Sequence, residues 1–180
     1  MPLHSVEGTF DAATDTAVRS EWAALADAGL PSQARHTGAT NAPHVTLALA
    51  GGVPEAALAD IVRALAGRDG VPVRLGPLLV LGARRFALAR LVVPSVALLR
   101  LHEAVAAAVV GLPDVPEQVL PGRWTPHVTI ARGLTPSQVA EALGVLGRVP
   151  PLDGAVESVR RWDPDAGRAW QVGGLPTMGP

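Results

Sequence analysis

A short motif occurs twice in the chain and contains the side chains best suited to chemistry. Pro-His-Val-Thr-Leu-Ala begins at Pro43 and Pro-His-Val-Thr-Ile-Ala begins at Pro126, so the copies differ only by Leu for Ile. Each copy follows a loop that contains proline, residues 31–42 before the first and 113–125 before the second. Because the copies lie about half a chain apart, they predict two similar lobes rather than a solenoid.

Each copy places a histidine and a threonine two residues apart, His44 with Thr46 and His127 with Thr129. Alternate side chains of a β-strand point to the same face, so each strand presents one imidazole and one hydroxyl together. The apolar residues between them point to the opposite face and supply core. If the two lobes pack with these faces together, two histidines and two threonines converge in one cleft.

Two imidazoles in one cleft suit phosphoryl chemistry. A neutral imidazole removes a proton from the nucleophile, and a protonated one donates a proton to the leaving oxygen. With a free pKa of about 6.5, imidazole holds both states near neutral pH. Threonine hydroxyls can donate to the non-bridging oxygens as negative charge builds there. Structural histidines are one alternative; a two-histidine metal site is another, but it lacks a third ligand on these strands.

The rest of the chain alternates strands and helices. Hydrophobic periodicity predicts helices at 12–29, 54–66, 95–110 and 136–148, and strands at 3–10, 43–50, 71–81, 85–93, 125–131, 154–162 and 168–174. Ser95 is a predicted helix cap, and Thr135 with Gln138 forms a predicted capping box. This order predicts an α+β fold, a single domain over residues 1–180 with mostly antiparallel sheets and helices packed outside.

With both motifs in matched strand contexts, the sequence resembles the two-histidine (2H) phosphoesterase superfamily. The second copy, PHVTIAR, is similar to the bacterial branch called 2′-5′ RNA ligases or RNA 2′,3′-cyclic phosphodiesterases. The resemblance covers most of the chain and implies a bilobal duplicated fold, in which two mostly antiparallel sheets face a central cleft. Each pseudo-symmetric lobe then carries one His-x-Thr motif.

The resemblance also implies roles for individual residues. It makes four residues the catalytic set: His44, Thr46, His127 and Thr129. It makes His127 the base, His44 the acid and Arg132 a phosphate ligand. Strict strand alternation from His127 turns Arg132 to the opposite face, so Arg132 reaches the cleft only if the strand ends or bulges near Ala131. A surface ion pair is the alternative for Arg132.

Two residues before the second motif are candidates for substrate contact. Trp124 could stack a nucleobase, or it could pack its loop against a lobe. Arg123 could steer a phosphate, or it could be a solvated charge. His102 lies next to an apolar helical face and is interpreted as a boundary residue. His4 has no partner in the repeat and is assigned no role.

Composition restricts the chemistry further. The net charge is −1, so a broad basic surface for RNA is not expected, and an RNA substrate would be held at an end or a single phosphate. All fifteen basic residues are Arg, which excludes a lysine-linked nucleotidyl intermediate and a P-loop. No use of ATP is therefore expected, and no cofactor or metal is predicted. The absence of cysteine, of a signal peptide and of a long apolar span indicates a cytoplasmic protein, and nothing demands more than a monomer.

The sequence therefore predicts a metal-independent phosphodiesterase that opens 2′,3′-cyclic phosphate ends of RNA by acid–base catalysis between two histidines. The resemblance implies a 2′-phosphate product and a reverse 2′-5′ ligation. Two alternatives stay open. The substrate could be a small cyclic nucleotide such as ADP-ribose 1″,2″-cyclic phosphate, or the cleft could bind RNA ends without turnover.

Overall fold

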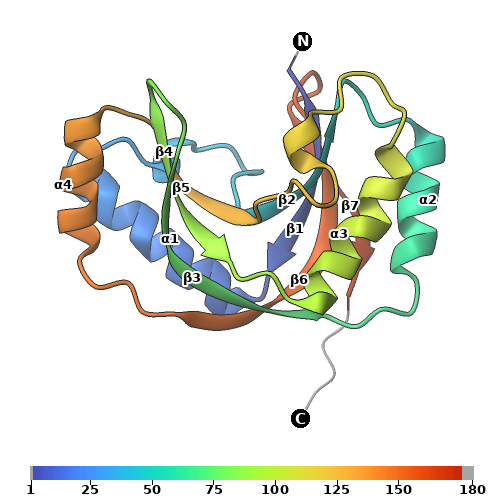
Figure 1. Ribbon diagram of the computed structural model, residues 1–180, viewed down its shortest axis with the longest axis horizontal. Helices are drawn as coiled ribbons and strands as arrows, with labels where there is room; N and C mark the ends of the chain where they lie inside the picture. Colours follow the sequence, from blue (N-terminus) through green and yellow to red (C-terminus); the bar gives the residue numbers. More distant parts are fainter. Residues whose placement is uncertain (1, 176–180) are drawn as a thin grey trace.

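The computed structural model describes residues 2–175, which form an α+β fold of antiparallel strands and four α-helices (Figure 1). The strands are β1 (His4–Phe10), β2 (His44–Ala50), β3 (Val71–Leu81), β4 (Phe86–Val92), β5 (His127–Leu134), β6 (Leu152–Asp163) and β7 (Arg168–Gly174). The α-helices are α1 (Ala12–Asp27), α2 (Glu55–Leu65), α3 (Val96–Val109) and α4 (Pro136–Leu146), with short 3₁₀ turns η1 (Gln33–Arg35) and η2 (Glu117–Val119). The expected fold class is confirmed.

The strands form one sheet in the order β1-β2-β5-β4-β3-β6-β7, where two separate sheets were expected. Two sets of strand pairings join the strands into this single sheet. Val45 of β2 pairs with Val128 of β5, and the long strand β6 pairs with β3 through residues 152–156 and with β1 and β7 further along. Because β1 also pairs with β6, the hydrogen-bonded neighbours β1-β2-β5-β4-β3-β6 form a closed circuit.

The helices pack outside this sheet, as expected. In Figure 1, α1 and α4 cover the half of the molecule that contains β3, β4 and β5, whereas α2 and α3 cover the half that contains β1, β2 and β7. Helix α1 buries Val18, Trp22 and Leu25, because residues about one turn apart share one helical face. The indole nitrogen of Trp22 donates to the backbone oxygen of Thr129 at 3.0 Å, which ties α1 to β5. The first helix of the chain thus supports the second histidine motif.

Most element boundaries lie within two residues of those predicted. Ser95 caps α3 by accepting from the N–H of Leu98, and Thr135 and Gln138 form the expected capping box at α4. The main difference is β5, which continues to Leu134 instead of ending at residue 131. Within residues 2–175, no helix is long and apolar enough to cross a membrane.

Asp11 joins the start of α1 to β6. Its carboxylate accepts from the N–H and hydroxyl of Thr14 at 2.9 and 2.7 Å, and from the N–H of Ala155 at 2.7 Å. Gly154 permits this approach, because a Cβ there would lie 1.9 Å from Thr14 Oγ1. Burial by itself would raise the pKa of Asp11, but these donors outweigh it and lower the pKa below 3.8.

We expect Asp11→Ala to lower the free energy of unfolding by about 1–2 kcal/mol, because a helix cap and a link to β6 are both lost. Urea denaturation at pH 7 measures this. Since the pKa of Asp11 is lower in the folded protein, its charge-dependent contribution is present above pH 3.8 and is lost as the pH falls through the folded value. Asp69→Ala, at an exposed loop carboxylate, is the control. Equal effects from both substitutions would contradict this role of Asp11.

Candidate functional site

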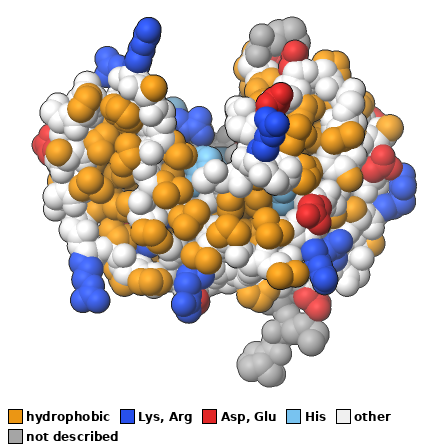
Figure 2. Space-filling view, in the orientation of Figure 1, with side chains coloured by type: hydrophobic (Ala, Val, Ile, Leu, Met, Phe, Trp, Pro, Cys, Tyr) orange, Lys and Arg blue, Asp and Glu red, His pale blue; other side chains and the backbone are white. Residues whose placement is uncertain are grey.

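The two histidine motifs lie on neighbouring strands, β2 and β5, which pair antiparallel through Val45 and Val128. Both valines are buried in the core, with exposed fractions of 0% and 1%. Extending that register by one residue in each direction puts the histidine of each motif opposite the threonine of the other. All four predicted catalytic side chains therefore lie on one face of the sheet. Figure 2 shows a hollow between the two halves of the molecule, with histidine atoms visible in it.

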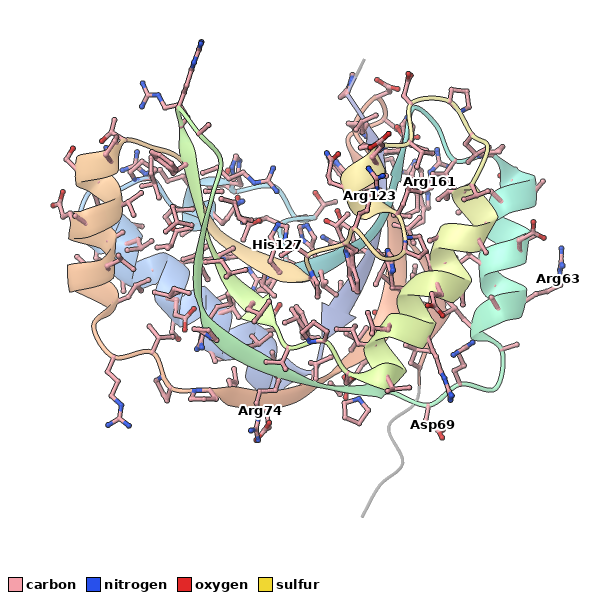
Figure 3. The ribbon with its side chains drawn as sticks, in the orientation of Figure 1. Arg63, Asp69, Arg74, Arg123, His127 and Arg161 are labelled. Carbon is pink, nitrogen blue, oxygen red and sulfur yellow. The ribbon has the colours of Figure 1, made fainter. Side chains whose placement is uncertain are left out.

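Both imidazoles are held in the same way. His44 Nδ1 lies 2.8 Å from the backbone oxygen of Ala42, and His127 Nδ1 lies 2.7 Å from that of Thr125. A carbonyl oxygen only accepts, so Nδ1 carries the proton in each ring. Nε2 is then the nitrogen of each histidine that can accept or donate a proton in a reaction. Figure 3 shows His127 between the two halves of the molecule.

A buried carboxylate lies beside His44. Glu7 of β1 is 4% exposed, and its Oε1 lies 3.5 Å from His44 Nε2. Ser5 donates to the same carboxylate at 2.6 Å, and Arg160 of β6 contacts it at 2.8 Å. Burial by itself would raise the pKa of Glu7, but the charges of His44 and Arg160 and the donated hydrogen bonds lower it. His44 thus faces a carboxylate that stays ionised.

His127 has the opposite electrostatic surroundings. Burial lowers the pKa of the His127 imidazole, and the positive charges of Arg132 and His44 lower it further, against the bond to Thr125. A cavity of about 410 Å³ adjoins His127 and Thr129, and Arg85 and Arg132 also line it. The neutral imidazole is therefore favoured at His127, in a cavity that carries positive charge.

The side chain of Arg132 lies on the same face as the histidines. Its NH2 donates to Thr129 Oγ1 at 3.4 Å. Strand β5 shifts register against β4 twice. Ala89 faces Thr129, Leu88 faces Ala131 and Phe86 faces Leu134, so β5 has an extra residue at each step. The first bulge, between Thr129 and Ala131, reverses the alternation that would have turned Arg132 away.

The side chains of Trp124 and Arg123 both make contacts with other residues of the chain. The guanidinium of Arg123 pairs with Glu117 at the surface (Figure 3). The indole nitrogen of Trp124 donates to the backbone oxygen of Thr46 at 2.9 Å, and its ring stacks on His102 at 3.9 Å. These contacts favour the packing interpretation of Trp124. His102 was interpreted as a boundary residue, and this is wrong, because its side chain is only 1% exposed. The indole of Trp124 covers it, and its Nε2 bonds to the backbone oxygen of Val119 at 2.9 Å.

Sequence reasoning missed four residues that surround the predicted set: Ser5, Glu7, Arg85 and Arg160. Ser5 and Glu7 did leave a signal, because they alternate with apolar residues along a strand that was predicted. A charged residue within such a strand indicates a polar face that something must neutralise. Arg160 and Arg85 carry no comparable signal, since each reaches the site from a distant part of the sequence.

The described residues also contain one group with metal-ligand atoms, formed by His4, Asp163 and Asp165. Arg161 is already inserted there, with its NH2 3.2 Å from His4 Nδ1 and 2.9 Å from an Asp163 oxygen. This guanidinium supplies the positive charge that a cation would bring. His4 pairs with Ala50, the last residue of β2, whereas His44 is the first. The group therefore lies apart from the histidine motifs.

The sequence matches the 2′-5′ RNA ligase superfamily over residues 14–168, a range that includes both histidine motifs. The chain belongs to the 2′-5′ RNA ligase superfamily. The expectation of a two-histidine phosphoesterase is thus confirmed at the level of the family. No curated protein sequence matches the chain.

Solved structures agree with this superfamily assignment in their fold. TT0787 of Thermus thermophilus has 19% identity and a TM-score of 0.57, with 99% of this chain and 100% of that one covered. Usb1 of Kluyveromyces marxianus has 17% identity and a TM-score of 0.53, with 97% of each chain covered. A second Usb1 structure, with uridine monophosphate, has 16% identity, a TM-score of 0.53 and coverages of 97% and 98%. At these identities the likeness establishes the fold.

We expect the second bulge of β5, between Ala131 and Leu134, to depend on Gly133, whose φ is +75°. Gly133→Ala should lower the free energy of unfolding by about 1–2 kcal/mol, because an L side chain disfavours this backbone conformation. No atom lies within 4 Å of the added Cβ, so the cost comes from the backbone and not from a clash. Urea denaturation measures it.

Gly144 of α4 is the matched control, since its Cβ would also meet open space but its backbone is helical. Gly144→Ala should raise the stability by about 0.5–1 kcal/mol. If both substitutions changed stability in the same direction, positive φ at Gly133 would not be what specifies the bulge.

Proposed function

We propose that this protein is a metal-independent phosphodiesterase that opens 2′,3′-cyclic phosphate ends of RNA. The observation that carries the proposal is the pairing of β2 with β5, which puts two His-x-Thr motifs on one face with both Nδ1 atoms bonded to the backbone. Two reactive Nε2 atoms and two hydroxyls then serve one phosphate. Membership of the 2′-5′ RNA ligase superfamily and the uridine monophosphate in one Usb1 structure support a nucleotide substrate.

The surroundings of the two histidines support different roles for them. His127, whose pKa is lowered, is the base that removes a proton from water. His44, beside the ionised Glu7, is the acid that donates a proton to the leaving oxygen. The hydroxyls of Thr46 and Thr129 and the guanidinium of Arg132 stabilise charge on the non-bridging oxygens. If a 5′-hydroxyl replaces water as the nucleophile, the same displacement of O3′ gives a 2′-5′ linkage without ATP.

We expect His44→Ala and His127→Ala each to lower kcat by about 10²–10⁴-fold, because each removes one of two proton transfers. The substrate is a 2′,3′-cyclic mononucleotide in buffer with EDTA, and product formation is followed by chromatography. His36→Ala is the matched control, since His36 is an exposed histidine outside both motifs. The double variant should be little slower than either single one, since both residues serve one mechanism.

Three results would count against this function. Near-full turnover by both folded single variants would remove the histidines from catalysis. Loss of wild-type turnover in EDTA, with recovery on adding a divalent ion, would indicate metal-assisted hydrolysis. Binding of cyclic nucleotides without any turnover would favour a module that only binds RNA ends.

We expect Glu7→Gln to lower kcat/KM for the cyclic nucleotide by about tenfold, because it removes the carboxylate whose Oε1 lies 3.5 Å from Nε2 of His44, the proposed acid. Active enzyme needs one neutral and one protonated histidine, so the pH profile of kcat/KM should be bell-shaped. Burial and the charges of Arg132 and His44 lower the pKa of His127, so the acidic limb of the profile should lie below the range of a free imidazole.

Glu7→Asp retains the charge and should restore kcat/KM in part, although its shorter side chain lies further from His44. A purely structural Glu7 would give a different result. Glu7→Gln would then lower the protein's melting temperature, and Glu7→Asp would lower kcat/KM as much as Glu7→Gln does.

A further inference from the structure

A second and larger cavity is lined by neighbours of His44, although His44 itself is not in its lining, and it lies across β2 from β5. Its volume is about 710 Å³, and residues of α1, the loop before β2, β6 and β7 line it. Thr9, in its lining, is the residue of β1 that pairs with His44. Ala42, whose backbone oxygen orients the His44 imidazole, also lines it. The cavity therefore begins next to the proposed acid and is large enough for one nucleoside.

The charges of this cavity differ from those around His127. Asp15 and Glu157 contribute carboxylates, and Asp15 is paired with Arg19. The guanidinium of Arg160 is already bonded to Glu7 and to the backbone oxygen of Thr40. The cavity beside His127 instead contains two arginines that pair with no carboxylate among the described ion pairs. A phosphate is thus favoured near His127, and an uncharged group is favoured beyond His44.

The remaining lining suits an uncharged polar group. Ser158 and Thr9 place their hydroxyls 2.5 Å apart, and Gln171 adds an amide. Phe10 and Ala12 provide apolar surface. Ligand sites of this size typically combine apolar surface with a few polar groups that fix orientation.

The proposed reaction fixes which part of the substrate lies on this side. Water attacks phosphorus and gives its proton to His127, a new P–O bond forms, and the bond between phosphorus and the ribose O3′ breaks. His44 protonates O3′, so the ribose that carries O3′ must reach His44. Because attack is in line, this ribose lies opposite the incoming water.

We propose that the cavity beside His44 binds the nucleoside that carries the cyclic phosphate, while the arginine-lined cavity beside His127 receives the phosphate and the attacking water. This inference rests on the proposed function. The protein would then recognise a single terminal nucleotide, because the carboxylates of Asp15 and Glu157 in this cavity disfavour binding of a longer, polyanionic chain there.

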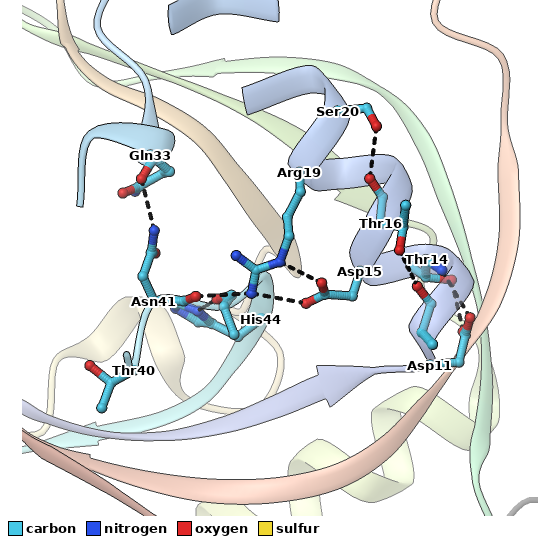
Figure 4. A network of polar contacts seen from close by, with 12 residues as sticks. Asp11, Thr14, Asp15, Thr16, Arg19, Ser20, Gln33, Thr40, Asn41 and His44 are labelled. Carbon is cyan, nitrogen blue, oxygen red and sulfur yellow. Dashed lines mark hydrogen bonds and ion pairs between the residues drawn. The ribbon is translucent and has the colours of Figure 1, made fainter. Parts of the chain in front are cut away.

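The test fills the cavity from two sides. Thr16 is exposed on α1 and lines the cavity, and Gln171 lines it from β7. Ser20 is the matched control for Thr16, because both are exposed on α1 and both donate a hydroxyl to the carbonyl four residues earlier (Figure 4). Ser20 lies outside the cavity lining. The variants are Thr16→Trp, Gln171→Trp and Ser20→Trp, with circular dichroism melts to confirm folding.

Titration calorimetry with two probes, cytidine 2′-monophosphate and inorganic phosphate, gives the readout. Thr16→Trp and Gln171→Trp should weaken binding of the nucleotide by at least about tenfold, because the site for its nucleoside is filled, and should leave phosphate binding unchanged. Ser20→Trp should change neither. The two Kd values of the wild-type protein should also differ, with the nucleotide bound more tightly than phosphate.

The inference is overturned if both cavity variants bind the nucleotide as the wild type does, or if they lose both probes equally. It is also overturned if the wild type binds the nucleotide no more tightly than phosphate. Turnover of the 2′,3′-cyclic nucleotide by the wild type reports on the proposed function separately. Unaltered nucleotide binding in the filled variants, with turnover intact, would remove the subsite and leave the phosphodiesterase standing.

Discussion

The contact between β2 and β5 is the constraint on which the site depends. These two strands carry the histidine motifs, yet they pair through a single residue pair, Val45 with Val128. Because side chains alternate along a strand, a slip of one residue would turn one histidine to the opposite face. The two valines are buried, so their burial penalises that slip. Hydrophobic packing on one face thus holds the polar face in register.

The duplicated motif becomes chemically asymmetric through its neighbours. Each histidine has the same bond from Nδ1 to a backbone oxygen two residues earlier, so the two rings are alike within their own strands. Glu7 reaches one ring from β1, and Arg132 affects the other from its own strand. One ring therefore lies beside a carboxylate and the other beside a guanidinium. This difference is what the proposed acid–base pair needs from two otherwise similar histidines.

The sequence predicted what depends on local periodicity, and it missed what depends on distant partners. The strands of the two motifs, the helix caps at Ser95 and Thr135 and the shared face of histidine and threonine follow from spacing alone. The bulges in β5 do not, because they are defined by register against β4. Glu7 was missed for a similar reason, since its neighbours His44 and Arg160 are far away in the chain.

The sparse pairing of β2 and β5 leaves backbone oxygens that need donors, and two tryptophans supply them. Trp22 donates to the oxygen of Thr129, and Trp124 to that of Thr46. Indole emission responds to hydrogen bonding and to nearby groups, and the chain has only four tryptophans. Half of its intrinsic fluorophores therefore contact the backbone of the threonines at the site. A shift of either strand during ligand binding would alter the ultraviolet emission, so the protein carries its own optical probe of this site.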